Sequence, residues 1–220
     1  PSGHVHAGGD EVLKTAWLNC DHCRQRMRDE NLRDDFGALD PERLQAYFMD
    51  RLAEGLAKRD RRMVAWDEVV DGGCSKDVIV MAWRGYEYGL RAARLGYQVV
   101  MCPETKACYL DHKQFDLEDE PGHLGVCTAK DSYDFDPAPA SLPAAARDNI
   151  LGGQANLWSE LLYFGRQAEY MLFPRLCAIA EALWTPVELK DFNSFSKRME
   201  LHGLRLDGLG VQRYRGPLQV

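Results

Sequence analysis

The stretch VIVMAWRGYEYGLRAARLGYQVVM, residues 78–101, decides the fold. It starts with an apolar run at 78–83, continues with a helical pattern from Tyr86 to Leu95, and ends with a second apolar run at 98–101. Gly96 follows the helical pattern, as glycine commonly does at the end of a helix. Apolar, β-branched runs without clean alternation are typical of strands covered on both faces. The stretch therefore predicts a parallel α/β sheet.

The same pattern recurs on both sides of this stretch. Further strands are expected at residues 5–8, 63–66 and 149–152. Helices are expected at 13–28, 41–59, 167–184 and 191–206, the second with Asp40 as its N-cap and Pro41 in its first position.

Four of these five strands end in an aromatic or acidic residue or lead directly to one. In α/β barrels the working residues lie at the carboxyl ends of the strands, and a complete barrel needs eight strands and about 250 residues. The sequence therefore predicts α/β class and a partial TIM (β/α) barrel. It corresponds to about the last five β/α units, strands 4–8, and lacks the first three. We expect one truncated catalytic domain over residues 1–220.

Charge and hydropathy exclude several classes of partner. The formal net charge of −7 argues against nucleic acid or an anionic membrane as the main partner. No apolar run approaches the roughly 18–20 residues needed to span a bilayer. A secretory h-region is also absent from these residues, and the chain starts at Pro1 rather than Met. These features indicate a soluble, processed or excerpted chain. They leave the compartment, cytoplasmic or periplasmic, undetermined.

The seven cysteines form a poor disulfide framework, because they are odd in number and scattered. This weakly favours a reducing compartment, although one or two disulfides stay possible. Cys20-Asp-His-Cys23 has the one spacing typical of a metal site, but zinc would need two further ligands and no second CxxC exists. We expect an ordinary pair of helix-end thiols, with no metal and no cofactor.

An acidic turn follows the first strand, in His6-Ala-Gly-Gly-Asp-Glu-Val12. The two glycines let the backbone bend sharply and approach a ligand. Neighbouring carboxylates repel each other electrostatically when both are charged, so one tends to stay ionised while the proton affinity of the other rises. That division suits a general acid beside a charged stabiliser. Taken alone, the turn is a weak signal, and such a motif is more often a solvated loop with two acids.

Aromatic residues at other strand ends favour the functional interpretation. Trp66, Trp83 and Trp158 occupy equivalent places after three strands, and each taken singly would more often be a core residue. Together with Tyr109, Asp111 and Glu160 they indicate a carbohydrate pocket. Sugars present apolar C–H faces to aromatic rings and hydroxyls to carboxylates.

These motifs together resemble family 20 of the glycoside hydrolases, the β-N-acetylhexosaminidases. The resemblance covers nearly the whole chain and follows the family's order. It rests on Pro1-Ser2, His6, Gly8-Gly9-Asp10-Glu11-Val12, Trp66-Asp67-Glu68, Tyr109-Leu-Asp111, Gly152-Gly153-Gln154-Ala-Asn-Leu-Trp158-Ser-Glu160, Tyr170-Met-Leu-Phe-Pro174-Arg175, and the closing helix with Phe195, Arg198, His202, Leu206 and Gly210-Val211.

The resemblance implies substrate-assisted catalysis, in which the 2-acetamido oxygen of the substrate is the nucleophile. Glu11 would then be the general acid and base. Asp10 would hold the acetamido N–H and stabilise the positive intermediate, and Tyr109 would donate to the acetamido oxygen. Trp66, Trp83 and Trp158 would wall the sugar pocket, and Asp111 and Glu160 would accept from its hydroxyls.

Other positions keep open interpretations. His6 either orients Asp10 or packs in the core. Asp67 and Glu68 are divided between a structural contact and the rim of the site.

The resemblance also implies parts that these 220 residues do not contain. Family members carry an earlier part of the barrel, with an arginine on the first strand that grips the sugar hydroxyls. A five-strand sheet would expose two edges, near residues 4–8 and 149–153, and exposed edges invite pairing. We therefore expect a homo-oligomer, or a complementary chain that covers the open side.

Two functions follow from these considerations. One is an exo-acting hexosaminidase on amino-sugar glycans or chitooligosaccharides, with its site completed by another subunit. The other is an inactive sugar-binding or structural half-barrel.

Overall fold

The computed structural model describes residues 2–105, 107–115 and 120–218. The chain divides into two compact units. The first comprises Pro1–Trp83, Glu87–Val100 and Ser141–Leu151, and the second Arg84–Tyr86, Met101–Ala140 and Gly152–Val220. Each unit is described by itself.

A five-stranded sheet has the order β1-β2-β3-β4-β7. Its strands are β1 (His4–His6), β2 (Arg62–Trp66), β3 (Ile79–Ala82), β4 (Gln98–Met101) and β7 (Ile150–Gly153). β1 pairs with β2 and β2 with β3, in both cases parallel. The sequence therefore located all five strands to within about one or two residues, and β1 and β7 form the edges that it predicted.

Burial differs from strand to strand. All four residues of β3 are buried, whereas all three of β1 are exposed. The expectation of strands covered on both faces thus holds for the centre of the sheet. It is wrong for β1, the first strand in the sheet order.

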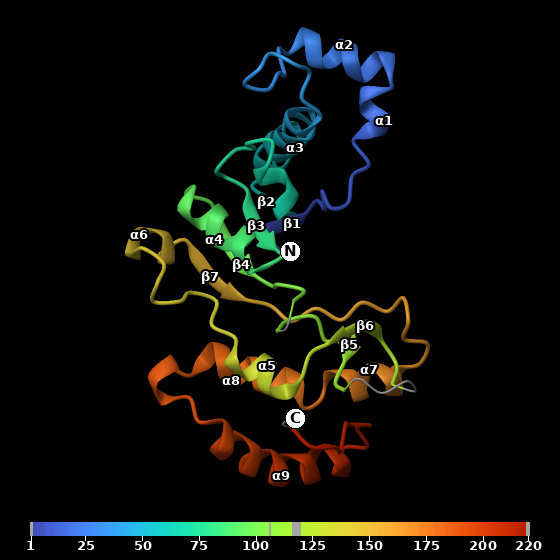
Figure 1. Cartoon of the computed structure of the whole chain (residues 1–220), viewed down its shortest axis with the longest axis vertical. Helices are drawn as coiled ribbons and strands as arrows, with labels where there is room; N and C mark the ends of the chain where they lie inside the picture. The colour runs from blue at the N-terminus through green and yellow to red at the C-terminus, as the bar shows by residue number, and fades with distance from the viewer. Residues whose placement is uncertain (1, 106, 116–119, 219–220) are drawn as a thin grey trace. The chain divides into compact units, whose positions relative to one another are not determined.

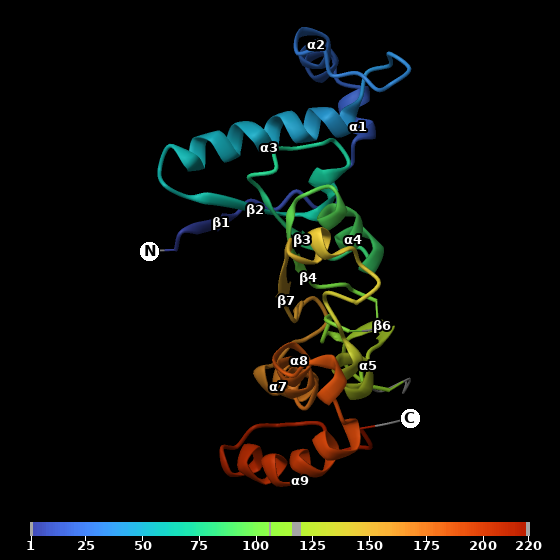
Figure 2. The same ribbon diagram turned by 90° about the vertical axis from the view of Figure 1, so that its left-hand side faces the viewer.

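The helices of the first unit are α1 (Thr15–Leu18), α2 (Asp21–Asp29), α3 (Pro41–Ala57), α4 (Tyr86–Arg94) and α6 (Ala144–Arg147), and the 3₁₀ helix η1 is Asp67–Val70. The long helix α3 packs against β2 (Figure 2). Its first turn is fixed by Asp40, whose carboxylate accepts from the backbone N–H of Glu42 at 2.8 Å and of Arg43 at 3.4 Å. This is the N-cap that the sequence predicted.

The second unit holds a small two-stranded sheet and most of the later helices. The elements are β5 (His112–Lys113), β6 (His123–Val126), α5 (Ala129–Asp134), α7 (Gly165–Leu172), α8 (Arg175–Trp184), η2 (Val187–Leu189) and α9 (Phe192–Gly208). Helices α5 and α8 lie side by side (Figure 1). Their shared core contains Tyr133 and Ala178, together with Phe192, Phe195 and Met199 from α9.

Two helices expected from the sequence are each divided in two. Between α1 and α2, Cys20 has an extended backbone, with φ −97° and ψ 121°, which starts a new helix. Between α7 and α8, Pro174 has no N–H to donate and disfavours helical geometry at Phe173, which is extended. The Phe173–Pro174 peptide bond is cis.

Removing the α3 cap should lower stability. In Asp40→Ala, the first-turn N–H groups lose their acceptor, so we expect the free energy of unfolding to fall by about 1 kcal/mol. Asp35→Ala is the matched control because its side chain is 93% exposed, and it should change stability by less than about 0.5 kcal/mol. Urea unfolding followed by tryptophan fluorescence measures both. Equal midpoints for the two variants would contradict the cap.

Candidate active site

The acidic turn begins directly after β1 and needs unusual backbone angles. Gly8 and Gly9 have φ of 74° and 104°, and Glu11 has φ of 52°. A side chain on Gly9 would lie 3.1 Å from Cγ1 of Val69, so the position has little room as well as a left-handed backbone. A non-glycine residue in this region is uncommon and costs energy, and such strain clusters at functional sites.

Two buried side chains hold the turn. Gln45 of α3 donates from Nε2 to the carbonyl oxygen of Gly9 at 2.5 Å. Glu68 accepts the backbone N–H of Glu11 on Oε1 at 3.3 Å. The side chains of Asp10 and Glu11 belong to exposed residues, so the backbone is fixed while the carboxylates face solvent.

Glu68 also contacts a predicted sugar-binding residue. The indole Nε1 of Trp83 donates to both carboxylate oxygens of Glu68, at 3.2 and 3.1 Å. The neighbouring Asp67 accepts the backbone N–H of Trp83 at 3.3 Å. Both carboxylates are buried, and buried charges require such donors. Glu68 therefore couples the acidic turn to Trp83 through one carboxylate.

His6 is an exposed residue at the end of β1 that contacts Trp66, so it does not pack in the core. Its Nδ1 accepts the backbone N–H of Gly8 at 3.1 Å, and its ring meets Trp66 edge-on at 4.8 Å between centroids. Burial lowers the pKa of His6, and the charge of Asp10 partly opposes this. A neutral imidazole keeps Nδ1 as the acceptor, so His6 supports the Gly8 backbone.

In the second unit, Tyr109 is buried and fixed to the segment that carries Trp158. The backbone N–H of Leu110 donates to the carbonyl of Asn156, and that of Asn156 donates to the carbonyl of Cys108, at 2.8 and 2.7 Å. The rings of Tyr109 and Trp158 lie 6.4 Å apart. Burial raises the pKa of Tyr109 well above its usual value, while Trp158 and Asn156 oppose the rise. The phenol therefore keeps its proton and can donate a hydrogen bond.

Asp111 is 2% exposed, and its Oδ1 accepts no hydrogen bond from the part of the chain that the structure describes. The backbone on both sides of it is held by Arg175, which is fully buried at the start of α8. The guanidinium donates to the carbonyls of Leu110 at 2.6 Å, His112 at 2.7 Å and Cys127 at 2.8 Å. Arg175 thus fixes the position of Asp111 by holding the backbone carbonyls of the residues before and after it.

Glu160 is more exposed, at 67% of its side chain, and lies 3.8 Å from Nε2 of His123. The rings of His123 and His112 are 6.4 Å apart across the β5–β6 sheet. A side chain on Gly125 would lie 2.4 Å from Nδ1 of His112, so glycine there makes room for the imidazole. Burial lowers the pKa of His112, with Asp111 and Glu104 opposing.

The structure thus places the predicted residues in two groups. His6, Asp10, Glu11, Trp66 and Trp83 gather around the acidic turn in the first unit, and Tyr109, Asp111, Trp158 and Glu160 lie in the second.

Sequence reasoning missed the supporting residues Gln45, His112 and His123. It included Arg175 in a motif without giving it a role, and it assigned Glu68 only in general terms. The Pro174-Arg175 motif was visible, but the apolar helix around it gave no sign that the guanidinium is buried.

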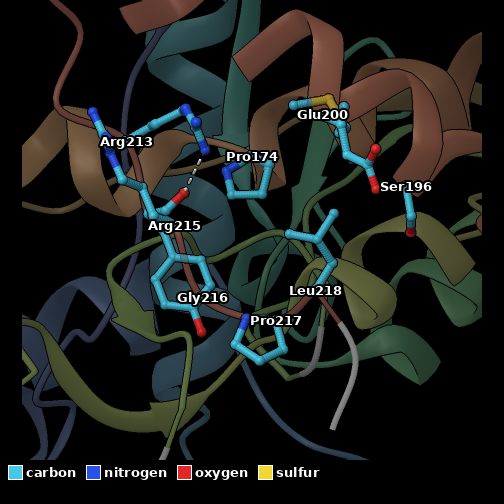
Figure 3. Close-up of a pocket in the computed structure, with 10 residues that line it drawn as sticks. Pro174, Ser196, Glu200, Arg213, Arg215, Gly216, Pro217 and Leu218 are labelled. Carbon is cyan, nitrogen blue, oxygen red and sulfur yellow. Dashed lines mark hydrogen bonds between the residues drawn. The ribbon is translucent and has the colours of Figure 1, made fainter. Parts of the chain in front are cut away.

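Other features lie apart from these groups. A cavity of about 560 Å³ lies between α9 and the C-terminal segment, with Pro174, Ser196 and Arg213 among its lining, and none of the predicted site residues lines it (Figure 3). Within the described ranges, no group of three or more His, Cys, Asp or Glu side chains could hold a metal ion. Over the same residues, every helix is too short or too polar to cross a membrane.

Comparison with known proteins decides the family. Residues 1–187 match the catalytic domain of glycosyl hydrolase family 20. The chain belongs to this family. The motifs in the sequence had indicated the same assignment, which is therefore confirmed.

Several relatives are much longer than this chain. A β-hexosaminidase of Porphyromonas gingivalis is 39% identical over 219 residues, which is 99% of this chain and 27% of the relative. A β-hexosaminidase of Vibrio furnissii is 33% identical over 82% of this chain and 29% of the relative. The chain therefore spans less than a third of these relatives.

Solved structures share the fold. The family 20 exo β-N-acetylglucosaminidase of Vibrio harveyi, in complex with N-acetylglucosamine, superposes with a TM-score of 0.86 and 33% identity over 100% of this chain and 34% of that one. The Streptomyces plicatus N-acetyl-β-hexosaminidase in complex with Thio-NAglucal superposes with a TM-score of 0.76 and 28% identity. The match covers 99% of this chain and 40% of that one. The α/β fold with a parallel sheet is thus common to family members.

Arg175 should be essential for stability of the second unit. In Arg175→Met, the carbonyls that it serves lose their buried donor, so we expect the free energy of unfolding to fall by about 3–5 kcal/mol. Arg166→Met on the exposed face of α7 is the control and should change it by less than about 0.5 kcal/mol. Urea unfolding measures both, and a loss below about 1 kcal/mol for Arg175→Met would contradict the assigned role.

Proposed function

We propose that this protein acts as an exo-β-N-acetylhexosaminidase. It hydrolyses terminal β-linked N-acetylglucosamine or N-acetylgalactosamine of amino-sugar glycans or chitooligosaccharides. The observation that carries this proposal is the carboxylate of Glu68, which contacts both the Glu11 backbone and the Trp83 indole. Family membership and the N-acetylglucosamine complex of the Vibrio harveyi enzyme support the substrate class.

The proposed mechanism is substrate-assisted and retaining. The 2-acetamido oxygen attacks the anomeric carbon while Glu11 protonates the leaving oxygen. The bond to the leaving group breaks, and an oxazolinium-type intermediate forms. Glu11, now a carboxylate, takes a proton from water, which opens the intermediate and restores the original anomeric configuration.

Asp10 and Tyr109 act on the acetamido group. Asp10 accepts its N–H and stabilises the positive charge of the intermediate, a task for a carboxylate that stays ionised beside Glu11. Tyr109 donates to the acetamido oxygen and aims it at the anomeric carbon. The raised pKa of the buried phenol supports this role, because the proton is retained at neutral and alkaline pH.

The remaining residues bind the sugar. Trp66, Trp83 and Trp158 pack against its apolar faces, and Asp111 and Glu160 accept from its hydroxyls. The unoccupied acceptor Oδ1 of Asp111 supports its part, because a buried carboxylate oxygen requires a donor. His6 supports the turn through Gly8.

We further propose that the sheet is the last five β/α units of a TIM barrel, strands 4–8, within one truncated catalytic domain of residues 1–220. The parallel sheet with edges at β1 and β7, and the greater length of the relatives, support this. A second copy or a complementary chain would cover the open side and complete the site.

A second candidate is a half-barrel that binds sugar without turnover. The observation in its favour is the buried Oδ1 of Asp111, an acceptor that can hold a sugar hydroxyl whether or not the glycosidic bond is cleaved. It would bind N-acetylglucosamine saturably and release no product.

Turnover of a chromogenic β-N-acetylglucosaminide tests the enzymatic proposal. We expect the 220-residue chain to release the chromophore, and Glu11→Gln to lower kcat/KM by on the order of 10²–10⁴-fold, as for loss of a general acid–base group. The glucoside with the same leaving group should not react, because a 2-hydroxyl cannot replace the acetamido nucleophile. Glu30→Gln, in a residue outside both groups, is the control and should keep full activity.

The outcomes separate the candidates. Glucoside turnover equal to that of the acetamido substrate would refute substrate assistance. No turnover, with saturable quenching of tryptophan fluorescence by N-acetylglucosamine, would establish the second candidate.

Self-association tests the open-edge proposal. The chain has a mass of 25.0 kDa, and we expect light scattering to give at least twice this value, because paired edges satisfy backbone groups that β1 and β7 otherwise expose. A monodisperse monomer across the concentration range would exclude the homo-oligomer, although a complementary chain could still bind.

A further inference from the structure

Asn156 has no role in the proposed hydrolysis, although it lies beside Tyr109 in the second unit. The two residues form an isolated parallel bridge, in which the main chain of Asn156 is hydrogen-bonded to Cys108 and Leu110. Paired segments of this kind lie about 4.8 Å apart, and bridge partners carry their side chains on the same face. The Asn156 side chain is therefore a direct neighbour of the Tyr109 side chain.

The segment around Asn156 directs every second residue to this face. Gln154 lies two residues before Asn156 and donates from Nε2 to its Oδ1 at 2.7 Å. Trp158 lies two residues after it, and its ring is 6.4 Å from that of Tyr109. Both contacts match an extended segment, in which residues two apart point the same way. Gln154, Asn156 and Trp158 thus line one face beside Tyr109.

The amide of Asn156 has a donor without an acceptor. Its Oδ1 is bonded to Gln154, which leaves Nδ2 at the other end of the planar group. Nδ2 is buried and donates to no acceptor in the part of the chain that the structure describes. The residue is 7% exposed, and a buried polar atom that stays unpaired costs free energy. Asn156 therefore holds an unused donor next to the residue proposed to bind the acetamido group.

Tyr109 offers a matching acceptor. A phenol oxygen has one proton to donate and lone pairs that accept. Burial raises the pKa of Tyr109, and the side chains of Trp158 and Asn156 oppose that rise, as N–H groups directed at the oxygen do. Hydrogen bonds of active sites are often long without ligand and shorten in the complex, so an open Nδ2 is compatible with this direction.

We propose that Asn156 is a positioning residue, whose Nδ2 donates to the phenol oxygen of Tyr109 and thereby directs the phenol proton to bound ligand. An N–H group on the inner side of the oxygen prevents the hydroxyl from turning its proton towards Asn156. The proton is left for an acceptor in the site, which is the acetamido oxygen. This last assignment rests on the proposed function, whereas the bond between Asn156 and Tyr109 does not.

Binding of N-acetylglucosamine to the 220-residue chain, followed by quenching of tryptophan fluorescence, tests the positioning. In Asn156→Ala the donor is lost, so we expect Kd to rise on the order of 3–10-fold. Tyr109→Phe should raise Kd at least as much. In the Tyr109→Phe background, Asn156→Ala should add less than about twofold, because Asn156 acts through the phenol. Asn193→Ala, at an exposed position of α9, is the control and should leave Kd unchanged.

A double-mutant cycle of unfolding tests the bond without ligand. Urea midpoints are measured for Asn156→Ala, Tyr109→Phe and the double variant. We expect the double variant to lose less than the sum of the two single losses, because each substitution alone removes the same hydrogen bond. Asn156→Asp keeps the side-chain shape and the acceptor for Gln154 while removing the donor, so it replaces Asn156→Ala in both cycles if that variant does not fold.

The outcomes distinguish this inference from the proposed function. No saturable binding of N-acetylglucosamine by the unsubstituted chain would refute the proposed function, and the unfolding cycle would then decide the inference. Three results would each overturn it: additive losses in the unfolding cycle, additive rises in Kd, or an unchanged Kd in Asn156→Ala beside a raised Kd in Tyr109→Phe.

Discussion

The second unit depends on the buried guanidinium of Arg175. Burial of a cation away from water costs free energy unless hydrogen-bond acceptors replace the water. The planar guanidinium of arginine can donate to several carbonyls at once. Here it serves Leu110, His112 and Cys127, whose segments precede α8 by 48 to 65 positions. One side chain of α8 thus joins the residues on both sides of Asp111 to Cys127, which directly follows β6. The Asp111 carboxylate is consequently positioned without using its own Oδ1.

In the first unit, the main chain of the acidic turn is also held by buried polar side chains, but these are a carboxylate and an amide. The acidic turn needs left-handed backbone at Gly8, Gly9 and Glu11, and such strain persists only where the surroundings over-determine it. Glu68 and Gln45 fix this backbone conformation through hydrogen bonds to the main chain of Glu11 and Gly9, and the side chains of Asp10 and Glu11 stay exposed. In both units, buried polar groups fix the main chain beside residues of the proposed site.

Much of this could be read from the sequence because the signals were local. Strand 98–101 has its predicted bounds, and α3 begins where Asp40 and Pro41 indicate. The helical pattern at 167–184 was misread because hydrophobic periodicity continues through Pro174, although proline cannot continue the hydrogen-bond ladder. The split at Cys20 had no such marker, since cysteine neither breaks nor starts helices strongly.

The supporting residues of the site were harder to predict, for a physical reason. The carbonyls of Leu110, His112 and Cys127 lie 48 to 65 positions from Arg175. The partners Trp83 and Glu11 lie 15 and 57 positions from Glu68, and no spacing rule connects such distant pairs. A buried arginine in an apolar helix has the same local sequence as an exposed one. The small sheet of β5 and β6 was missed because it is short and depends on glycines, Gly125 among them, that leave room for a neighbouring imidazole.

The position of the acidic turn at a sheet edge connects assembly with chemistry. β1 has β2 as its neighbour in the sheet order, and its three residues are exposed. The strand that ends at the two carboxylates is therefore the least constrained of the five, and the turn relies on Gln45 and Glu68 for its rigidity. Any chain that pairs with the free edge of β1 would immobilise the strand directly before Asp10 and Glu11. The proposed catalysis by Asp10 and Glu11 requires fixed geometry, so pairing of a chain with this edge would also affect the two carboxylates.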